Sequence, residues 1–305
     1  MLESIIILGT ITGLIYALIA LGFTLVYGIS GVVNLTHGAF FILGAYIYSI
    51  LLSFIQNYVS PDFLYLTPLL AILLSCIITG IIGSIFYRVT LHQILGDEVG
   101  ILIASICGCL IFYQLMYITV GVSAAFSFDV KLPIPGLPSK ITLINTDVLT
   151  GRALAALISL TAFITLSLLI SKTKTGRAMK ALSQDLEAAM LMGISLEKLY
   201  MFTTAISSGL ASLAGVLYTS TVTFGVSAQM WMIGLAISFT VVVLGGLGSI
   251  KGSLLGGLIL GISETAVMKI VPKGGVLQTS IPFIIIILML IIRPKGLFGK
   301  KIEIE

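Results

Sequence analysis

Residues 4–30 read SIIILGTITGLIYALIALGFTLVYGIS, a stretch without a single charged side chain. The charge-free region extends further, because no Asp, Glu, Lys or Arg occurs between Glu3 and Asp62. A helix that crosses the hydrocarbon of a membrane needs about 20 mostly apolar residues. The stretch is too long for the apolar region of a signal peptide and lacks a basic segment before it. We therefore interpret it as a retained first membrane helix.

The rest of the chain has the same character. Further charge-free stretches lie between Asp62 and Arg88 and between Lys198 and Lys251. Hydrophobic residues make up 58% of the 305 residues and charged residues only 9%, whereas a soluble domain carries about 25% charged residues. Backbone polar groups in lipid must be satisfied internally, by helices or closed barrels. Barrel strands alternate apolar and polar residues, but residues 281–292 are apolar throughout, which favours helices.

The sequence thus predicts an all-α polytopic membrane protein with about eight or nine transmembrane helices in a single transmembrane domain, residues 1–305. Between the first two spans, residues 28–38 are expected to form a break, as in a re-entrant structure. Glycines at small-residue spacing predict close helix packing. The expected spans are residues 5–27, 38–56, 64–86, 99–120, 150–171, 200–223, 231–249, 253–270 and 277–292.

Basic residues in short loops predict the orientation, because Lys and Arg collect on the cytoplasmic side. They gather in residues 172–180, in the C-terminal tail and after the third span. The prediction places the loop of about 172–199 and the C-terminus in the cytoplasm. The N-terminus and the extracytoplasmic loop, about 121–147, would then lie outside. That loop contains Pro133, Pro135, Gly136 and Pro138 and is expected to hold short extended pieces.

The cytoplasmic loop is the most informative segment. Apolar residues recur at helical spacing within it. Gly193 is expected to stop a short helix of roughly 184–192, and Ser195 to cap the next one. Such a helix is too short to span, and its apolar face needs a protein partner or lipid headgroups. The apolar positions are Met179, Leu182, Leu186, Ala189 and Met190.

The pattern Glu187-Ala188-Ala189 followed by Gly193 resembles the EAA---G coupling loop of ABC importer permeases. Four blocks in order, residues 16–40, 176–194, 243–257 and 293–299, resemble the branched-chain amino-acid importer permeases of the LivH type. One departure is Leu35-Thr36, where that family more often has an aromatic residue and then Ala.

The resemblance implies a set of partners and a location. These are a second homologous permease in a heterodimer, two cytoplasmic ATPase subunits and an extracytoplasmic substrate-binding protein, in a bacterial or archaeal cytoplasmic (inner) membrane. The chain contains no P-loop motif. We therefore expect ATP and Mg to be used by the partners. The sequence also shows no metal-ligand spacing, and we expect the chain to bind no cofactor and no metal and to have no catalytic residue. The implied ATPase-coupling residues are Gly176, Arg177, Asp185, Glu187, Ala188, Ala189 and Gly193.

Candidate residues of a substrate path are Asn34, His37, Gly245, Gly246 and Glu264. Intramembrane carboxylates are costly and suggest function. For Glu264 the alternative is a position near a helix end, paired with Lys269 or solvated. For His37 it is an interfacial histidine bonded to a carbonyl, and for Asn34 a helix cap.

The predicted function is a permease subunit of an ATP-driven importer for branched-chain or other hydrophobic amino acids. Related architectures carry urea, short amides or sugars, so these solutes remain alternatives. A self-contained secondary transporter or channel is a different class, and it would need an ion-coupling site for which Glu264 is the one candidate.

Overall fold

The computed structural model describes residues 1–58, 66–120, 140–143, 146–219, 227–272, 274–277, 280–293 and 296–298. Within them, seven helices are long and apolar enough to cross a membrane, and two shorter apolar helices accompany them. The nine predicted segments are therefore confirmed as apolar helices. The long helices are α1 (Leu2–Ser30), α2 (His37–Tyr58), α3 (Thr67–Phe86), α4 (Glu98–Val120), α5 (Thr150–Lys172), α8 (Leu196–Thr219) and α10 (Ile250–Ile270), and the short ones are α9 (Trp231–Gly245) and α12 (Ile281–Ile292).

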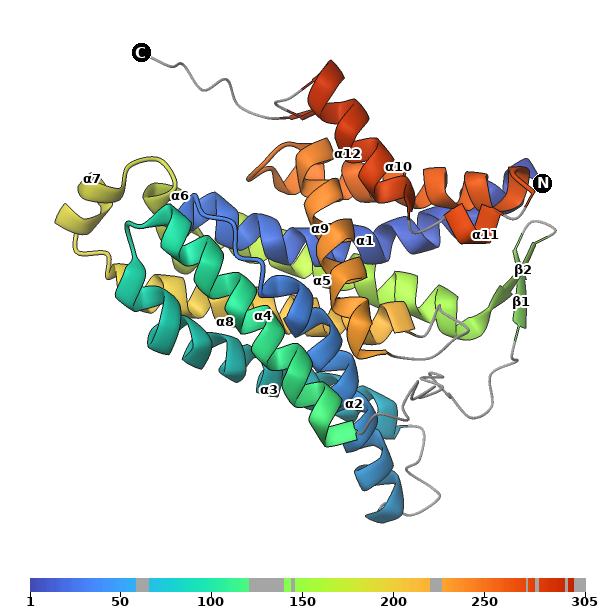
Figure 1. The fold of residues 1–305 in the computed structure, drawn as a ribbon, viewed down its shortest axis with the longest axis horizontal. Coiled ribbons are helices and arrows are strands. Elements are labelled where there is room, and N and C mark those ends of the chain that lie inside the picture. The colour runs from blue at the N-terminus through green and yellow to red at the C-terminus, as the bar shows by residue number, and fades with distance from the viewer. Residues whose placement is uncertain are drawn as a thin grey trace.

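Small elements mark the two ends of the helical bundle (Figure 1). The short helices α6 (Lys174–Leu182) and α7 (Leu186–Leu191) lie at one end. The N-terminus and the hairpin of β1 (Lys140–Leu143) and β2 (Thr146–Leu149) lie at the other end. The strands pair antiparallel and account for the short extended pieces predicted in loop 121–147. The prolines predicted to shape that loop fall in 121–139, outside the described residues.

Helix α1 forms the centre of the bundle. All of its residues from 15 to 25 are buried, and it packs against α10, α8, α9 and α5. Figure 1 shows it running between these helices. A helix that is apolar on all sides can lie in the core of a bundle or face lipid. Its hydrophobicity alone fits either environment, and its packing against four helices places α1 in the bundle interior.

Glycines allow the closest helix crossings. A Cβ added to Gly257 of α10 would lie 2.6 Å from the backbone nitrogen of Ala17 on α1, and a Cβ on Gly261 would collide with Gly13. On the other side of the bundle, a Cβ on Gly215 of α8 would collide with the carbonyl of Phe41 on α2. Small residues let membrane helices approach to backbone contact, so the close packing predicted from glycine spacing is confirmed here.

Several boundaries differ from the prediction. Helix α3 continues through a π-helix, η2 (Tyr87–Leu91), and a 3-10 turn, η3 (His92–Ile94). Helix α9 follows the turn η4 (Ala228–Met230) and ends at Gly245, because Gly246 adopts φ 98°. The last helix starts at Ile281, after the short α11 (Gly274–Leu277), with a proline in its first turn, where proline is tolerated.

Candidate functional site

The predicted coupling loop begins with α6, which is fixed against the end of α5. The Thr173 hydroxyl caps α6 by accepting a hydrogen bond from the Gly176 amide at 3.0 Å. A Cβ on Gly176 would collide with the backbone of Ile170 in α5. Met179 and Leu182 are buried below it. Gly176 is therefore required by packing, whereas the neighbouring Arg177 is exposed and available to a partner.

Helix α7 is a single short turn that is capped at both ends. Oδ1 of Asp185 accepts a hydrogen bond from the Ala188 amide at 3.0 Å, which is an N-cap. At the other end the Gly193 amide bonds to the Met190 carbonyl at 2.9 Å, and the Ile194 amide bonds to the Ala189 carbonyl at 3.2 Å. This pair of bonds is a Schellman motif, and Gly193 has φ 83°. The predicted helix stop at Gly193 is confirmed, and α8 begins directly after Ser195.

The predicted apolar stripe of this loop is only partly correct. The chain bends at 183–185, so α6 and α7 are separate helices rather than one periodic face. Ala189 is buried against the bundle, but Leu186 and Met190 are exposed, by 41% and 44%. The tip formed by Leu191 and Met192 is exposed by 89% and 84%. The exposed apolar surface of α7 therefore faces away from the bundle, together with Glu187 and Ala188.

The break after α1 brings Asn34 into the interior. Gly31 ends α1 in the left-handed conformation, with φ 68°, and α2 starts at His37. Asn34 is 8% exposed, and its Oδ1 accepts a hydrogen bond from the Thr36 amide at 3.0 Å. This bond closes an Asx-type turn before α2. Asn34 therefore closes the turn before α2 and also lines an interior cavity.

His37 is in the bundle interior and is 3% exposed. Its Nε2 lies 2.9 Å from the Ile19 carbonyl, and since a carbonyl only accepts, Nε2 carries the hydrogen. In the neutral ring Nδ1 is then an acceptor, 3.3 Å from the Ser207 hydroxyl. The single hydrogen of that hydroxyl also has the Gly22 carbonyl as an acceptor, at 2.8 Å, so the carbonyl and Nδ1 compete for it. His37 thus joins α1, α2 and α8 through one polar cluster.

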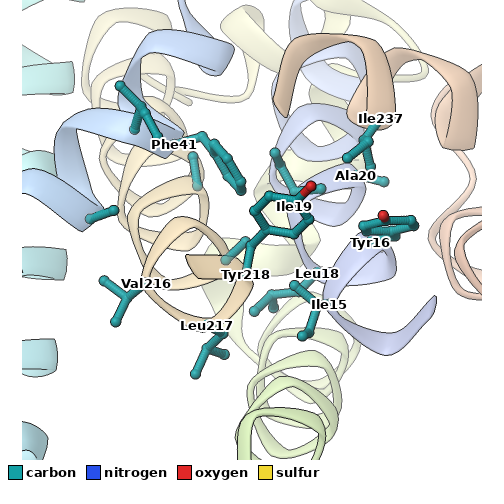
Figure 2. Close-up of a cluster of buried hydrophobic side chains, with 14 of the residues drawn as sticks. Ile15, Tyr16, Leu18, Ile19, Ala20, Phe41, Val216, Leu217, Tyr218 and Ile237 are labelled. Carbon is teal, nitrogen blue, oxygen red and sulfur yellow. The ribbon is translucent and has the colours of Figure 1, made fainter. Parts of the chain in front are cut away.

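Glu264 is 3% exposed, in the interior of α10. The Tyr16 hydroxyl of α1 donates to its Oε2 at 2.6 Å. Tyr218 of α8 lies beside Tyr16, with ring centroids 6.2 Å apart, and Figure 2 shows both rings in the buried cluster. The alternative of a solvated carboxylate is wrong, because Glu264 is buried in the bundle, whereas Lys269 is exposed.

Gly245 and Gly246 occupy the turn between α9 and α10. A Cβ on Gly245 would collide with Gly252. The tail is bound here, because the amides of Leu297 and Phe298 donate to the carbonyls of Leu244 and Gly245 at 2.9 and 3.0 Å. Packing of the tail and of α10 accounts for both glycines, and their role in a path stays a prediction.

The sequence reasoning missed the hydroxyl residues of α8 and the tyrosine partners. Thr203, Thr204, Ser207 and Ser208 are all buried, on the face of α8 that adjoins Asn34 and the His37 cluster. Their spacing of three and four residues places them on one helix face. This spacing could have predicted a polar face on α8 from the sequence. The contact between Tyr16 and Glu264 could not be predicted in this way.

Comparisons with known proteins agree with this architecture. The profile of the family described as "Branched-chain amino acid transport system / permease component" matches residues 5–292. The high-affinity branched-chain amino acid transport system permease protein BraD of Pseudomonas aeruginosa is 31% identical over 298 residues, covering 97% of this chain and 95% of BraD. LivH of Escherichia coli K12, a permease protein of the same kind of system, is 30% identical over 311 residues, covering 97% of this chain and 95% of LivH.

A solved structure shows the same fold. PsaBC from Streptococcus pneumoniae, determined in complex with Fab, superposes with a TM-score of 0.52 and 15% identity, covering 95% of this chain and 92% of that chain. The family match and the long apolar helices together define a multi-pass membrane transport subunit. The chain belongs to the family of permease components of branched-chain amino acid transport systems.

Proposed function

We propose that this chain is the membrane subunit of an ATP-driven importer of branched-chain amino acids. The observation that carries the proposal is the family match over residues 5–292. It is supported by the 31% identical BraD and the 30% identical LivH, which are both permease proteins of high-affinity branched-chain amino acid transport systems. The match includes the whole α6–α7 segment, where an import motor would act.

The proposed coupling element is α7 with its two caps. Its exposed residues Leu191 and Met192 form an apolar tip that needs a covering surface. Glu187 and Ala188 are exposed beside this tip. A groove on a cytoplasmic ATPase would accept this helix, and the ATPase would bind ATP and Mg. This chain would bind neither.

The remaining partners follow from the same family. A second homologous permease would complete the path, and an extracytoplasmic binding protein would deliver the solute. The loop 172–199 and the C-terminus would face the cytoplasm, because basic residues gather there. The separation of α7 from the N-terminus and hairpin (Figure 1) is compatible with this orientation.

The proposed path residues are Asn34, His37, Gly245, Gly246 and Glu264. The strongest support concerns Asn34 and His37, which line an interior cavity, and Glu264, a buried carboxyl. A buried carboxyl within a membrane helix is retained where it has a task. The most direct tasks are to balance the ammonium group of an amino acid or to hold α1 against α10.

The test is reconstitution of the complex with its ATPases, second permease and binding protein in liposomes. Leucine, isoleucine and valine are expected to be taken up with ATP and to stimulate ATP hydrolysis. Urea and short amides serve as competing solutes in the same vesicles. Uptake of those solutes alone would overturn the substrate assignment. Solute uptake by this chain alone, without ATP, would overturn the importer assignment in favour of a secondary transporter or channel.

A further inference from the structure

Two small cavities meet at the break between α1 and α2. The larger has about 30 Å³ and the smaller about 10 Å³, and both are lined by Val26, Asn34 and Thr204. A water molecule needs roughly 10–15 Å³ of such space. The cavities therefore have room for water but not for an amino acid, as expected of a passage that is closed.

The larger cavity has a polar side and an aliphatic side. The aliphatic side is made by residues such as Val26, Leu91 and Ile101. None of the described residues that line it is Asp, Glu, Lys or Arg. The polar side consists of hydroxyls and one amide, from Ser30, Asn34, Tyr87, Tyr200, Thr203 and Thr204.

One of these hydroxyls has no hydrogen-bond partner among the described residues. Tyr87 is 4% exposed, and its buried hydroxyl makes no hydrogen bond within the part of the chain that the structure describes. Its ring lies edge-on against that of Tyr200, with the ring centroids 6.1 Å apart. Buried polar groups are nearly always paired, and an unpaired one is destabilising. Tyr87 also begins the π-helix η2, and π-helical turns are frequent at functional sites. Both features indicate a cavity wall that meets a polar ligand.

The cavity wall is packed together with the coupling segment. One hydrophobic cluster contains Tyr87 and Tyr200 of the wall and Met179, Leu182 and Ala189 of α6 and α7. Tyr200 lies in the first turns of α8, which follows the coupling segment directly. Because packed side chains move together, a displacement of α7 would shift α8 relative to α1 and change the cavity.

We propose that these joined cavities are the closed inner compartment of the solute path, and that Tyr87 and Thr204 determine its specificity for aliphatic zwitterions. This inference rests on the proposed function. The aliphatic side would receive the branched side chain, while the hydroxyls and the Asn34 amide would hold the ammonium and carboxylate groups. Amino acids with a net charge are rejected, because the compartment offers no counter-charge and burying an unpaired charge is costly.

The test uses Tyr87→Phe, which removes only the unpaired hydroxyl, and Thr204→Val, which keeps the side-chain shape. Tyr117→Phe is the matched control, because Tyr117 is exposed on α4. The complete complex is reconstituted in liposomes, and the leucine taken up per ATP hydrolysed is measured in the same vesicles. We expect Tyr87→Phe and Thr204→Val each to lower this ratio about three- to tenfold, the effect of one lost hydrogen bond, and the control to match wild type.

A second measurement distinguishes a role in solute specificity from a role in helix packing. The uptake of lysine relative to leucine is measured for Thr204→Asp, which adds the missing counter-charge, and is expected to rise. If Tyr87→Phe and Thr204→Val both match wild type in leucine per ATP, the compartment assignment is overturned. Failure of the proposed function is a different result: the wild-type complex would then hydrolyse ATP but take up no branched-chain amino acid.

Discussion

The Tyr16 hydroxyl donates a 2.6 Å hydrogen bond to Oε2 of Glu264, joining α1 and α10 at the level of their glycine crossing. A hydrogen bond to an ionised carboxylate is stronger than one between neutral groups. The contact therefore provides a partner for a carboxyl group that would otherwise be costly in the membrane interior.

Glu264→Gln tests whether the charge or only the hydrogen bond is used. The amide oxygen still accepts from Tyr16, so we expect the melting temperature in detergent to remain close to wild type. If the carboxylate balances an ammonium group in transit, leucine uptake falls about tenfold or more, the order of effect of a lost charged hydrogen bond. Uptake in proteoliposomes measures this, and unchanged uptake would leave Glu264 with a purely structural role.

Gly215→Ala tests the crossing of α2 and α8. The added Cβ collides with the Phe41 carbonyl, and overpacking of this kind costs about 1–3 kcal/mol. We expect a lower melting temperature of the detergent-solubilised protein. Gly151→Ala in α5 is the control, because a Cβ there meets none of the described residues within 4 Å. Equal melting temperatures for the two variants would contradict the close packing.

Substitutions of Asp185 distinguish two roles for its side chain: capping α7 and forming an ion pair with the ATPase. Its carboxylate caps α7, and Asn caps as well as Asp, whereas Ala loses about 0.5–2 kcal/mol of helix stability. We expect Asp185→Asn to retain uptake and Asp185→Ala to reduce it, with ATPase co-purification following the same order. Loss of coupling in Asp185→Asn would instead show that the negative charge itself contacts the ATPase.

Two substitutions in α7 and its cap test the docking proposal. Ala188→Trp places a bulky side chain on an exposed position, and Gly193→Pro removes the amide that bonds to Met190 and cannot adopt a positive φ. We expect both to insert in the membrane but to lose ATPase co-purification and uptake. Lys140→Trp, in the hairpin at the opposite end, is the control. ATPase binding at the wild-type level by Ala188→Trp would argue against docking at α7.

The α7 segment shows which structural features can be predicted from neighbouring residues and which cannot. The stop at Gly193 was predicted correctly, because a helix end depends on neighbouring residues and their backbone conformation. The continuous apolar stripe was not, since the bend at 183–185 separates α6 from α7. As a result Leu186 and Met190 are exposed while Met179 and Ala189 are buried.

The sequence by itself determined the membrane class, the nine apolar helices and the presence of a capped segment. These properties follow from hydrophobic length and from residues within a turn of one another. Only the tertiary structure decided that Glu264 meets Tyr16, that His37 lies in the interior between Ile19 and Ser207, and that Tyr87 borders a cavity. Such contacts join residues far apart in the chain. They depend on which helices pack together, and hydrophobicity patterns do not contain this information.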